Sequence, residues 1–393
     1  FNFAEDVSVA ADGTAWTATR ANAAALRYDG EWRIYADSTT GGGFQDRFLY
    51  AVYASVSGPV WFGHCCHPTC RVDRLSEVDG IETWTAFPLI NAWDITEDAS
   101  GVIWFSTDDF GIYAYDASDE SLINLTASAG KLSSNRVETI APLSSRVRWI
   151  GHSLAGADRW DDAGTAEETD DTWRRFSVGD GLMSQSITAV VASGDTVYLG
   201  TPVGVCVFRD TVWLRNYTAS DLGLASAQVT DLAVDALGNV WVATLSGAAR
   251  MRAGGGVTSF VRERTGLVDD RVRAVAVDNA SGRVWFGTEG GVSVLKAWDP
   301  FAGRTLSDAY VFPNPFRRAE GHTEVRVAGI PSAVSVSIHD LAGRQVRAAG
   351  TVGSGDRIWD GRDPRGVPVP AGIYLVKMET ENDSRVVKLA VIR

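Results

Sequence analysis

The sequence predicts an all-β chain, with a seven-bladed β-propeller followed by a small β-sandwich. A unit made of a short strand, a tight turn and an aromatic-led strand occurs seven times in the first 300 residues. The 393 residues include 40 glycines and 14 tryptophans, which suits many short strands joined by turns, with one large aromatic side chain per unit. A second pattern of strands, without this repeat, begins at residue 309.

Seven aromatic residues mark the repeat at nearly constant spacing. Successive anchors are 45, 43, 45, 49, 43 and 44 residues apart, and they are Trp16, Trp61, Trp104, Trp149, Tyr198, Trp241 and Trp285. A four-stranded propeller blade uses about 40–45 residues. Each blade buries its faces only against its neighbours, so the units are expected to close into a ring. We therefore predict one propeller over residues 1–300.

The elements of each unit follow in a fixed order. An apolar first strand is predicted at 7–10, 49–52, 92–95, 137–140, 187–190, 229–232 and 272–275. A turn with Asp or Gly follows, as in Asp12-Gly13, because Asp caps its own backbone and Gly adopts positive φ. Outer strands carry a further aromatic at 32–35, 84–87, 173–176 and 213–217. The outer strand of the seventh blade is expected either from Phe301 to Leu306 or from residues upstream of Phe1.

The motifs of the unit resemble the two-component-regulator propeller repeat. The seventh unit has Trp285-Phe286-Gly287-Thr288, then Gly290-Gly291-Val292, and Gly266-Leu267 forms the link before it. The resemblance covers roughly residues 1–300. It implies a seven-bladed propeller of the kind found in periplasmic sensor domains or on secreted bacterial proteins.

The carboxy-terminal region has its own strand pattern. We expect a linker at 301–308 and a β-sandwich at 309–393, with strands at 325–327, 334–339, 344–347, 357–359, 373–379 and 386–392. Four motifs occur in sequence: Pro313 to Phe316, Ile338 to Arg344, Trp359 to Asp363 and Ala371 to Tyr374. Together they resemble the immunoglobulin-like FlgD-type domain and the carboxy-terminal sorting domains of the type IX secretion system. This resemblance implies export through the outer membrane of a bacterium, to the cell surface or the medium.

The charge of the chain excludes some classes of partner. It carries 36 Lys and Arg against 49 Asp and Glu, a formal net charge of −13. Such a surface repels phosphate backbones, so we expect no nucleic-acid partner. No apolar run approaches the roughly 18 residues that a membrane-spanning helix needs, so we expect no membrane insertion.

The second unit departs from the repeat at Gly63 to Cys70. Most units place Thr three residues after the aromatic anchor, but the second and fourth place His64 and His152 there. Thiolate and imidazole donors together suit zinc or copper, and the candidate ligands are His64, Cys65, Cys66, His67 and Cys70. The alternatives are a loop disulfide, Cys65–Cys70 or Cys66–Cys70, in an oxidising compartment, and free thiols; we favour Cys65–Cys70.

The same loops supply candidate ligand-binding residues. Loops between the second and third strands of a blade lie on the same face as the links between blades. The candidates on that face are His64, His67, His152, Asp94, Asp108 and Asp109. An acidic hairpin from Asp161 to Asp171 is either a calcium site or a solvated loop, and we favour the loop.

The architecture is clear from the sequence, whereas no catalytic motif is present. We therefore favour a secreted or cell-surface binding, adhesion or scaffold protein without catalytic activity and without a cofactor. Its partner is expected to be a glycan, a protein or further copies of itself. The alternatives are an extracellular polysaccharide lyase or hydrolase, which needs a positioned acid and base, and a ligand-sensing propeller.

Overall fold

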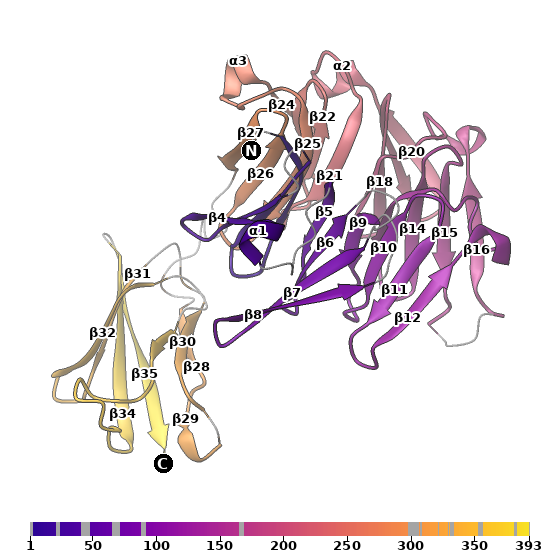
Figure 1. Cartoon of the computed structure of the whole chain (residues 1–393). Coiled ribbons are helices and arrows are strands. Elements are labelled where there is room, and N and C mark those ends of the chain that lie inside the picture. The colour runs from indigo at the N-terminus through magenta and orange to yellow at the C-terminus, as the bar shows by residue number, and fades with distance from the viewer. Residues whose placement is uncertain are drawn as a thin grey trace. The chain divides into compact units, whose positions relative to one another are not determined.

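The computed structural model describes residues 3–20, 24–40, 48–64, 71–87, 92–164, 169–297, 306, 309–320, 322–328, 330, 334–352, 357–380 and 383–392. The chain divides into two compact units, Phe1–Ala297 and Trp298–Arg393. Nearly all regular structure in both units is β-strand, as Figure 1 shows, so the predicted all-β fold is confirmed.

The first unit contains seven consecutive antiparallel sheets, each with its strands in chain order. The first three are β1 (Ala4–Val9), β2 (Ala15–Thr19), β3 (Ala24–Tyr28) and β4 (Trp32–Tyr35); β5 (Leu49–Ala54), β6 (Val60–His64), β7 (Val72–Val78) and β8 (Ile81–Phe87); and β9 (Ala92–Glu97), β10 (Ile103–Thr107), β11 (Ile112–Asp116) and β12 (Ser121–Leu125).

The next three sheets are also four-stranded. They are β13 (Val137–Pro142), β14 (Val147–His152), β15 (Ala157–Asp161) and β16 (Thr172–Phe176); β17 (Ala189–Ser193), β18 (Thr196–Thr201), β19 (Gly204–Arg209) and β20 (Val212–Tyr217); and β21 (Val229–Val234), β22 (Val240–Thr244), β23 (Gly247–Met251) and β24 (Val257–Phe260). The seventh sheet has three strands within the described residues: β25 (Val272–Asp278), β26 (Arg283–Thr288) and β27 (Gly291–Lys296).

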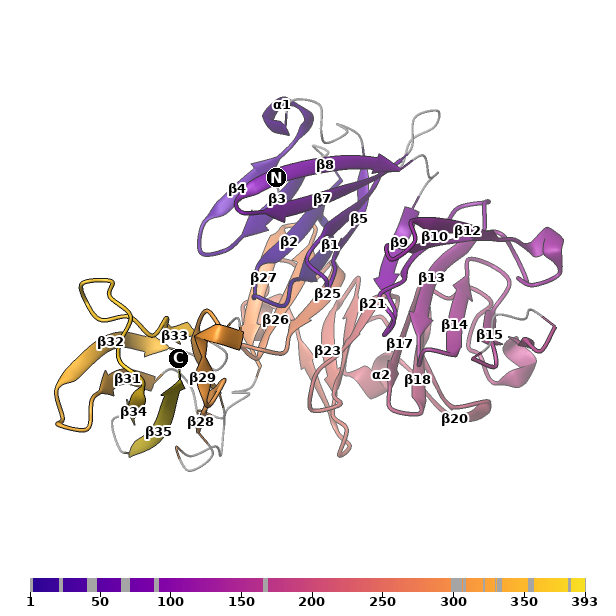
Figure 2. The same ribbon diagram turned by 90° about the horizontal axis from the view of Figure 1, so that it is seen from below.

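The seven sheets are arranged as blades around a common centre. The inner strands β1, β5, β9, β13, β17, β21 and β25 contact one another in that order, and β25 contacts β1. Figure 2 shows inner strands such as β9, β17 and β21 toward the middle of the unit, and outer strands such as β12 and β20 at its periphery. Single helical turns lie on five links between blades: α1 (Asp37–Thr40), η1 (Ala127–Ala129), η2 (Val178–Asp180), α2 (Ala219–Leu222) and α3 (Arg262–Thr265).

The aromatic anchors fill the space between neighbouring blades. All six tryptophan anchors are buried. In two blades the turn aspartate also accepts the indole N–H: Trp104 Nε1 lies 3.0 Å from Asp98 Oδ2, and Trp241 Nε1 lies 3.0 Å from Asp235 Oδ2. The same carboxylates accept backbone N–H groups of their own turns. These aspartates therefore form the turns, as predicted, and also orient the anchors.

The second unit consists of two sheets that share one hydrophobic core. One sheet has the order β28 (Tyr310–Phe312), β30 (Val325–Ala328) and β33 (Arg357–Trp359). The other has the order β29 (Phe316–Arg317), β35 (Ser384–Ile392), β34 (Gly372–Glu379), β31 (Val334–His339) and β32 (Gln345–Val352), with the short helix η4 (Arg318–Glu320) after β29. Trp359 is buried in this core, as expected. The immunoglobulin-like assignment and the boundary at 309 remain predictions.

Candidate functional site

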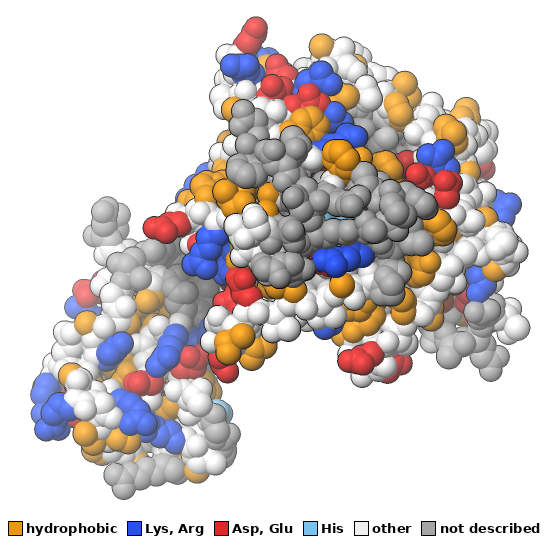
Figure 3. Space-filling view, viewed as in Figure 1, with side chains coloured by type: hydrophobic (Ala, Val, Ile, Leu, Met, Phe, Trp, Pro, Cys, Tyr) orange, Lys and Arg blue, Asp and Glu red, His pale blue; other side chains and the backbone are white. Residues whose placement is uncertain are grey.

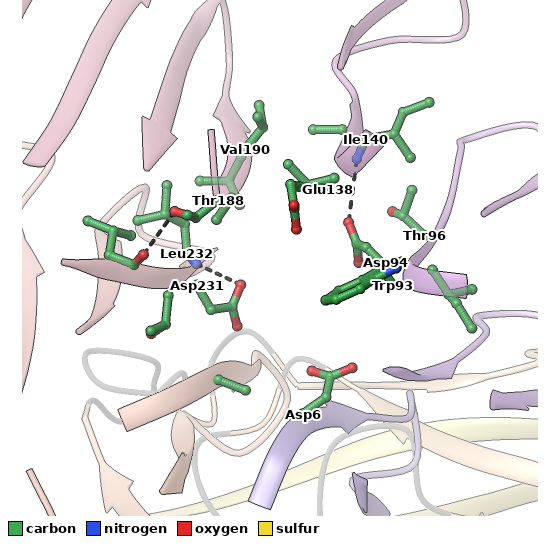
Figure 4. A pocket seen from close by; sticks show the side chains of 18 of the residues that line it. Asp6, Trp93, Asp94, Thr96, Glu138, Ile140, Thr188, Val190, Asp231 and Leu232 are labelled. Carbon is green, nitrogen blue, oxygen red and sulfur yellow. Dashed lines mark hydrogen bonds between the residues drawn. The ribbon is translucent and has the colours of Figure 1, made fainter. Parts of the chain in front are cut away.

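The inner strands of the first unit surround a cavity of about 580 Å³. Residues from β1, β9, β13, β17, β21 and β25 line it, together with Tyr50 of β5. Figure 4 shows carboxylate, hydroxyl and indole groups from several blades around this space. The cavity is therefore assembled from residues that recur at intervals of one blade along the chain.

A β-bulge near the start of each inner strand supplies the polar lining. In six blades the pairing between the first and second strands skips the second residue of the inner strand. Thr188 holds the same position immediately before β17. A bulge leaves one residue unpaired and re-aims its side chain. We call these seven cavity-lining residues the bulge ring: Glu5, Tyr50, Trp93, Glu138, Thr188, Thr230 and Arg273.

Three aspartates follow the bulge ring directly, and each accepts a backbone N–H of the next blade. The acceptor atoms and donors are Asp6 Oδ2 with Val52 N at 2.8 Å, Asp94 Oδ2 with Ile140 N at 3.4 Å and Asp231 Oδ2 with Val275 N at 2.8 Å. Asp6 and Asp231 also accept the N–H of the residue that follows each of them, Val7 and Leu232. These carboxylates therefore connect blades 1 to 2, 3 to 4 and 6 to 7.

Burial makes these three carboxyl groups harder to ionise. Burial raises the pKa of Asp231 to about 7, and the charge of Asp94 contributes to the increase. The pKa of Asp6 is raised by burial and by repulsion from Asp231 and Asp94. The pKa of Asp94 is raised by burial and by the nearby Glu138. The cavity thus concentrates carboxyl groups in a place where water solvates their charged form poorly.

Near Glu5, Tyr50 and Arg273 of the bulge ring, arginines accompany the acidic and aromatic groups. Arg20 lies 3.9 Å from Glu5, and its guanidinium lies 5.1 Å from the centre of the Tyr50 ring. Arg273 donates to Glu289 through Nε at 3.1 Å, and it lies 5.2 Å from the centre of the Phe3 ring.

Near Trp93 and Glu138 of the bulge ring, aromatic and acidic groups lie together. The Tyr50 and Trp93 rings are 5.0 Å apart between centroids and are tilted by 48°. Trp93 is followed directly by Asp94, and Glu138 lies near Asp94 (Figure 4). Neither Asp94 nor Glu138 forms an ion pair with a described Lys or Arg.

Two of the three histidines predicted to bind ligand, His64 and His152, are buried inside their blades. His64 Nε2 lies 3.1 Å from Asp73 Oδ2, and His152 Nε2 lies 2.9 Å from Asp158 Oδ2. Neither histidine side chain is exposed to solvent. In sibling blades the corresponding Thr donates to a carbonyl of the following strand, as Thr201 does to Gly204 of β19. The histidine–aspartate pairs therefore lie within the sheets, and neither histidine lines the central cavity.

The predicted aspartates are distributed over two places. Asp94 lines the cavity. Asp108 and Asp109 lie after β10, where Arg136 Nε is 2.8 Å from Asp108 Oδ1 and 3.6 Å from Asp109 Oδ1. The structure therefore brings Asp94 together with the bulge ring, whereas Asp108 and Asp109 form a separate surface ion pair with Arg136.

The predicted metal or disulfide loop, apart from His64, lies outside the part of the chain that the structure describes. Cys65, Cys66, His67 and Cys70 lie outside the described residues. Within the described ranges, no group of three or more His, Cys, Asp or Glu residues is arranged to hold a metal ion. In the acidic hairpin, Asp161 and Asp162 pair with Arg146 and Arg148. Cys206 is a buried free thiol whose pKa is raised by burial to about 11.

No protein-family model matches the chain, and no curated protein matches it. Solved structures do match. PorZ, described as an essential bacterial surface component of the type-IX secretion system of Porphyromonas gingivalis, is 19% identical, with a TM-score of 0.61 over 100% of this chain and 60% of PorZ. Virginiamycin B lyase from Staphylococcus aureus is 14% identical, with a TM-score of 0.55 over 75% of this chain and 94% of the lyase.

The WD40 β-propeller domain of Doa1 is 11% identical, with a TM-score of 0.55 over 75% of this chain and 92% of that domain. These similarities show that the chain has a β-propeller fold. Propellers serve many unrelated functions, so similarity at this level identifies the fold and not the activity. The chain spans 60% of the length of PorZ. No helix in the described ranges is long and apolar enough to cross a membrane.

Proposed function

We propose that this chain is a non-catalytic binding propeller of the bacterial cell surface or exterior, and that its ligand binds at the bulge ring of the central cavity. The observation that carries the proposal is the composition of that ring. Two aromatic rings, Tyr50 and Trp93, lie side by side in a cavity of about 580 Å³ that also contains several carboxylates. Concave sites with aromatic walls and a few polar groups are typical ligand sites.

The proposed location rests on two similarities. The carboxy-terminal motifs resemble sorting domains of the type IX secretion system, and the propeller fold is similar to that of PorZ, a bacterial surface component of that system. Adhesion or scaffold roles fit the same location. The expected partners are a glycan, a protein or further copies of this chain.

A binding screen with matched tryptophan variants tests the proposed site. The unaltered chain and its Trp93→Ala and Trp213→Ala variants are each applied to a glycan array and a peptide array. Trp213 is 47% exposed on the outer strand β20, so its removal controls for loss of an aromatic ring away from the cavity. We expect Trp93→Ala to abolish the signals of the unaltered chain and Trp213→Ala to retain them. The opposite result would move binding to the rim of the propeller.

An enzyme acting on a polysaccharide is the second candidate. The observation in its favour is Asp231, whose raised pKa of about 7 suits a group that exchanges protons near neutral pH. If the unaltered chain cleaves a polysaccharide and Asp231→Asn does not, while both remain folded, the catalytic function replaces the binding function.

A further inference from the structure

Building on the proposed function, we propose that the bulge ring binds an organic cation, a guanidinium or primary ammonium group, which lies on the Trp93 indole between Asp94 and Glu138. The cation comes either from the side chain of a basic peptide or from a small molecule. The arrangement of charges and rings around these three residues carries the inference.

The charges of the cavity favour a cationic ligand. Among the described residues, its lining includes a single arginine, Arg273, and six carboxylates: Glu5, Asp6, Asp94, Glu97, Glu138 and Asp231. The imbalance extends to the whole propeller, because residues 1–297 contain 38 Asp and Glu against 23 Lys and Arg. On the face shown in Figure 3, acidic side chains lie beside basic ones. Because carboxylates outnumber the arginine in the described lining of the cavity, its field attracts cations.

The bulge ring already contains examples of the contact that we propose. The guanidinium of Arg20 lies over the Tyr50 ring next to Glu5, and that of Arg273 lies over the Phe3 ring while it pairs with Glu289. Each example combines an arginine, an aromatic face and a carboxylate. Such a combination stabilises a cation through the ring quadrupole and through charge-assisted hydrogen bonds.

The Trp93 position has the ring and the carboxylates but lacks the cation. Asp94 and Glu138 provide the negative charge, and no described Lys or Arg stacks on Trp93 or pairs with either carboxylate. The indole Nε1 of Trp93 is buried, and it has no hydrogen-bond partner within the described ranges. Trp93, which lines the cavity, and the two carboxylates therefore match a guanidinium, such as that of a peptide containing arginine.

Calorimetric titration of the full chain tests the proposal with three probes. Acetyl-Gly-Arg-Gly-amide presents the side chain on a peptide, methylguanidinium presents the group alone, and acetyl-Gly-citrulline-Gly-amide is a neutral peptide of nearly the same shape. We expect the arginine peptide to bind at least about tenfold more tightly than the citrulline peptide. Binding of methylguanidinium as tight as that of the arginine peptide would identify a small cation as the source.

A charge-matched pair of variants locates the binding. Glu138→Gln removes one negative charge from the cavity, and Glu31→Gln removes one from the exposed turn between β3 and β4. We expect Glu138→Gln to weaken binding of the arginine peptide at least about tenfold and Glu31→Gln to leave it unchanged.

Two results would overturn the inference. One is equal binding, or no binding, of the arginine and citrulline peptides by the unaltered chain, which is independent of any variant. The other is equal affinity of the two glutamate variants. If the arrays instead reveal a neutral ligand whose binding is abolished by Trp93→Ala, the proposed binding site stands and the cationic ligand class is rejected.

Discussion

Asp231 is the residue at which the chemistry of the cavity affects the stability of the fold. Its carboxylate accepts two backbone N–H groups, one from its own blade and one from the next. Its pKa is nevertheless raised from 3.8 to about 7, because burial opposes ionisation more strongly than these hydrogen bonds favour it. In the folded chain, therefore, this carboxyl group keeps a proton at pH values where the unfolded chain has already released it.

This difference predicts that the propeller is more stable in mild acid. The contribution is fully present below the unfolded pKa of about 3.8 and is lost as the pH rises through about 7. The free energy of unfolding should fall by roughly 1.4 kcal/mol per pH unit between these values for a single group. Asp6 and Asp94 act in the same direction, since their pKa values are also raised.

Carboxyl groups with lowered pKa values do not mask this effect. Asp98 and Asp340 are examples, and their contribution is lost only as the pH falls below about 3.8. Urea unfolding at about pH 5.5 and about pH 7.5 measures the difference. We expect a higher midpoint at the lower pH and a smaller difference in Asp231→Asn. A midpoint that rises with pH would contradict the assigned ionisation.

Blades 2 and 4 differ from other blades at two positions whose side chains contact each other. Blades 2 and 4 place His at the end of the second strand and Asp in the third, where blades 1 and 6 have Thr19 with Leu26 and Thr244 with Ala249. In blade 4, Asp158 accepts from His152 and from both the N–H and the hydroxyl of Ser133. The pair is therefore a buried polar alternative to the Thr and the apolar residue that blades 1 and 6 have at these positions.

A double-mutant cycle tests whether the pair acts as a unit. Asp158→Ala leaves the buried donors of His152 and Ser133 without an acceptor, and should cost about 1–3 kcal/mol. The double variant His152→Thr/Asp158→Ala recreates the arrangement of blade 6, and should recover part of that loss. Chemical unfolding measures both. Additive losses in the double variant would show that the two residues do not depend on each other.

The sequence predicted the blades better than the contacts between them. The first strands of blades 2, 3, 4, 6 and 7 begin at the predicted residues, but β1 begins at Ala4 rather than residue 7. The reason is that Glu5 and Asp6 are polar and look like a link, although their side chains face the cavity. The sequence also contains a signal for the histidine–aspartate pairs. The dipeptides Asp73-Arg74 and Asp158-Arg159 occur in the two blades that carry His64 and His152.

At the scale of the whole molecule, the site exists only because the ring brings distant residues together. Tyr50, Trp93 and Glu138 are separated by more than 40 residues at each step, and each comes from a different blade. Periodicity predicted that these strands would be neighbours. It did not reveal the bulge ring, because an alternating strand pattern hides one extra residue. The cavity therefore had to be found from the assembled structure.

Hydrogen–deuterium exchange of the full chain, with and without acetyl-Gly-Arg-Gly-amide, tests the central claim most directly. If the ligand binds at the bulge ring, exchange should slow in β5, β9 and β13, the inner strands that carry Tyr50, Trp93 and Glu138. Peptides from the outer strands β4, β12 and β20 should be unchanged. Protection confined to those outer strands, or to the carboxy-terminal unit, would contradict a binding site in the central cavity.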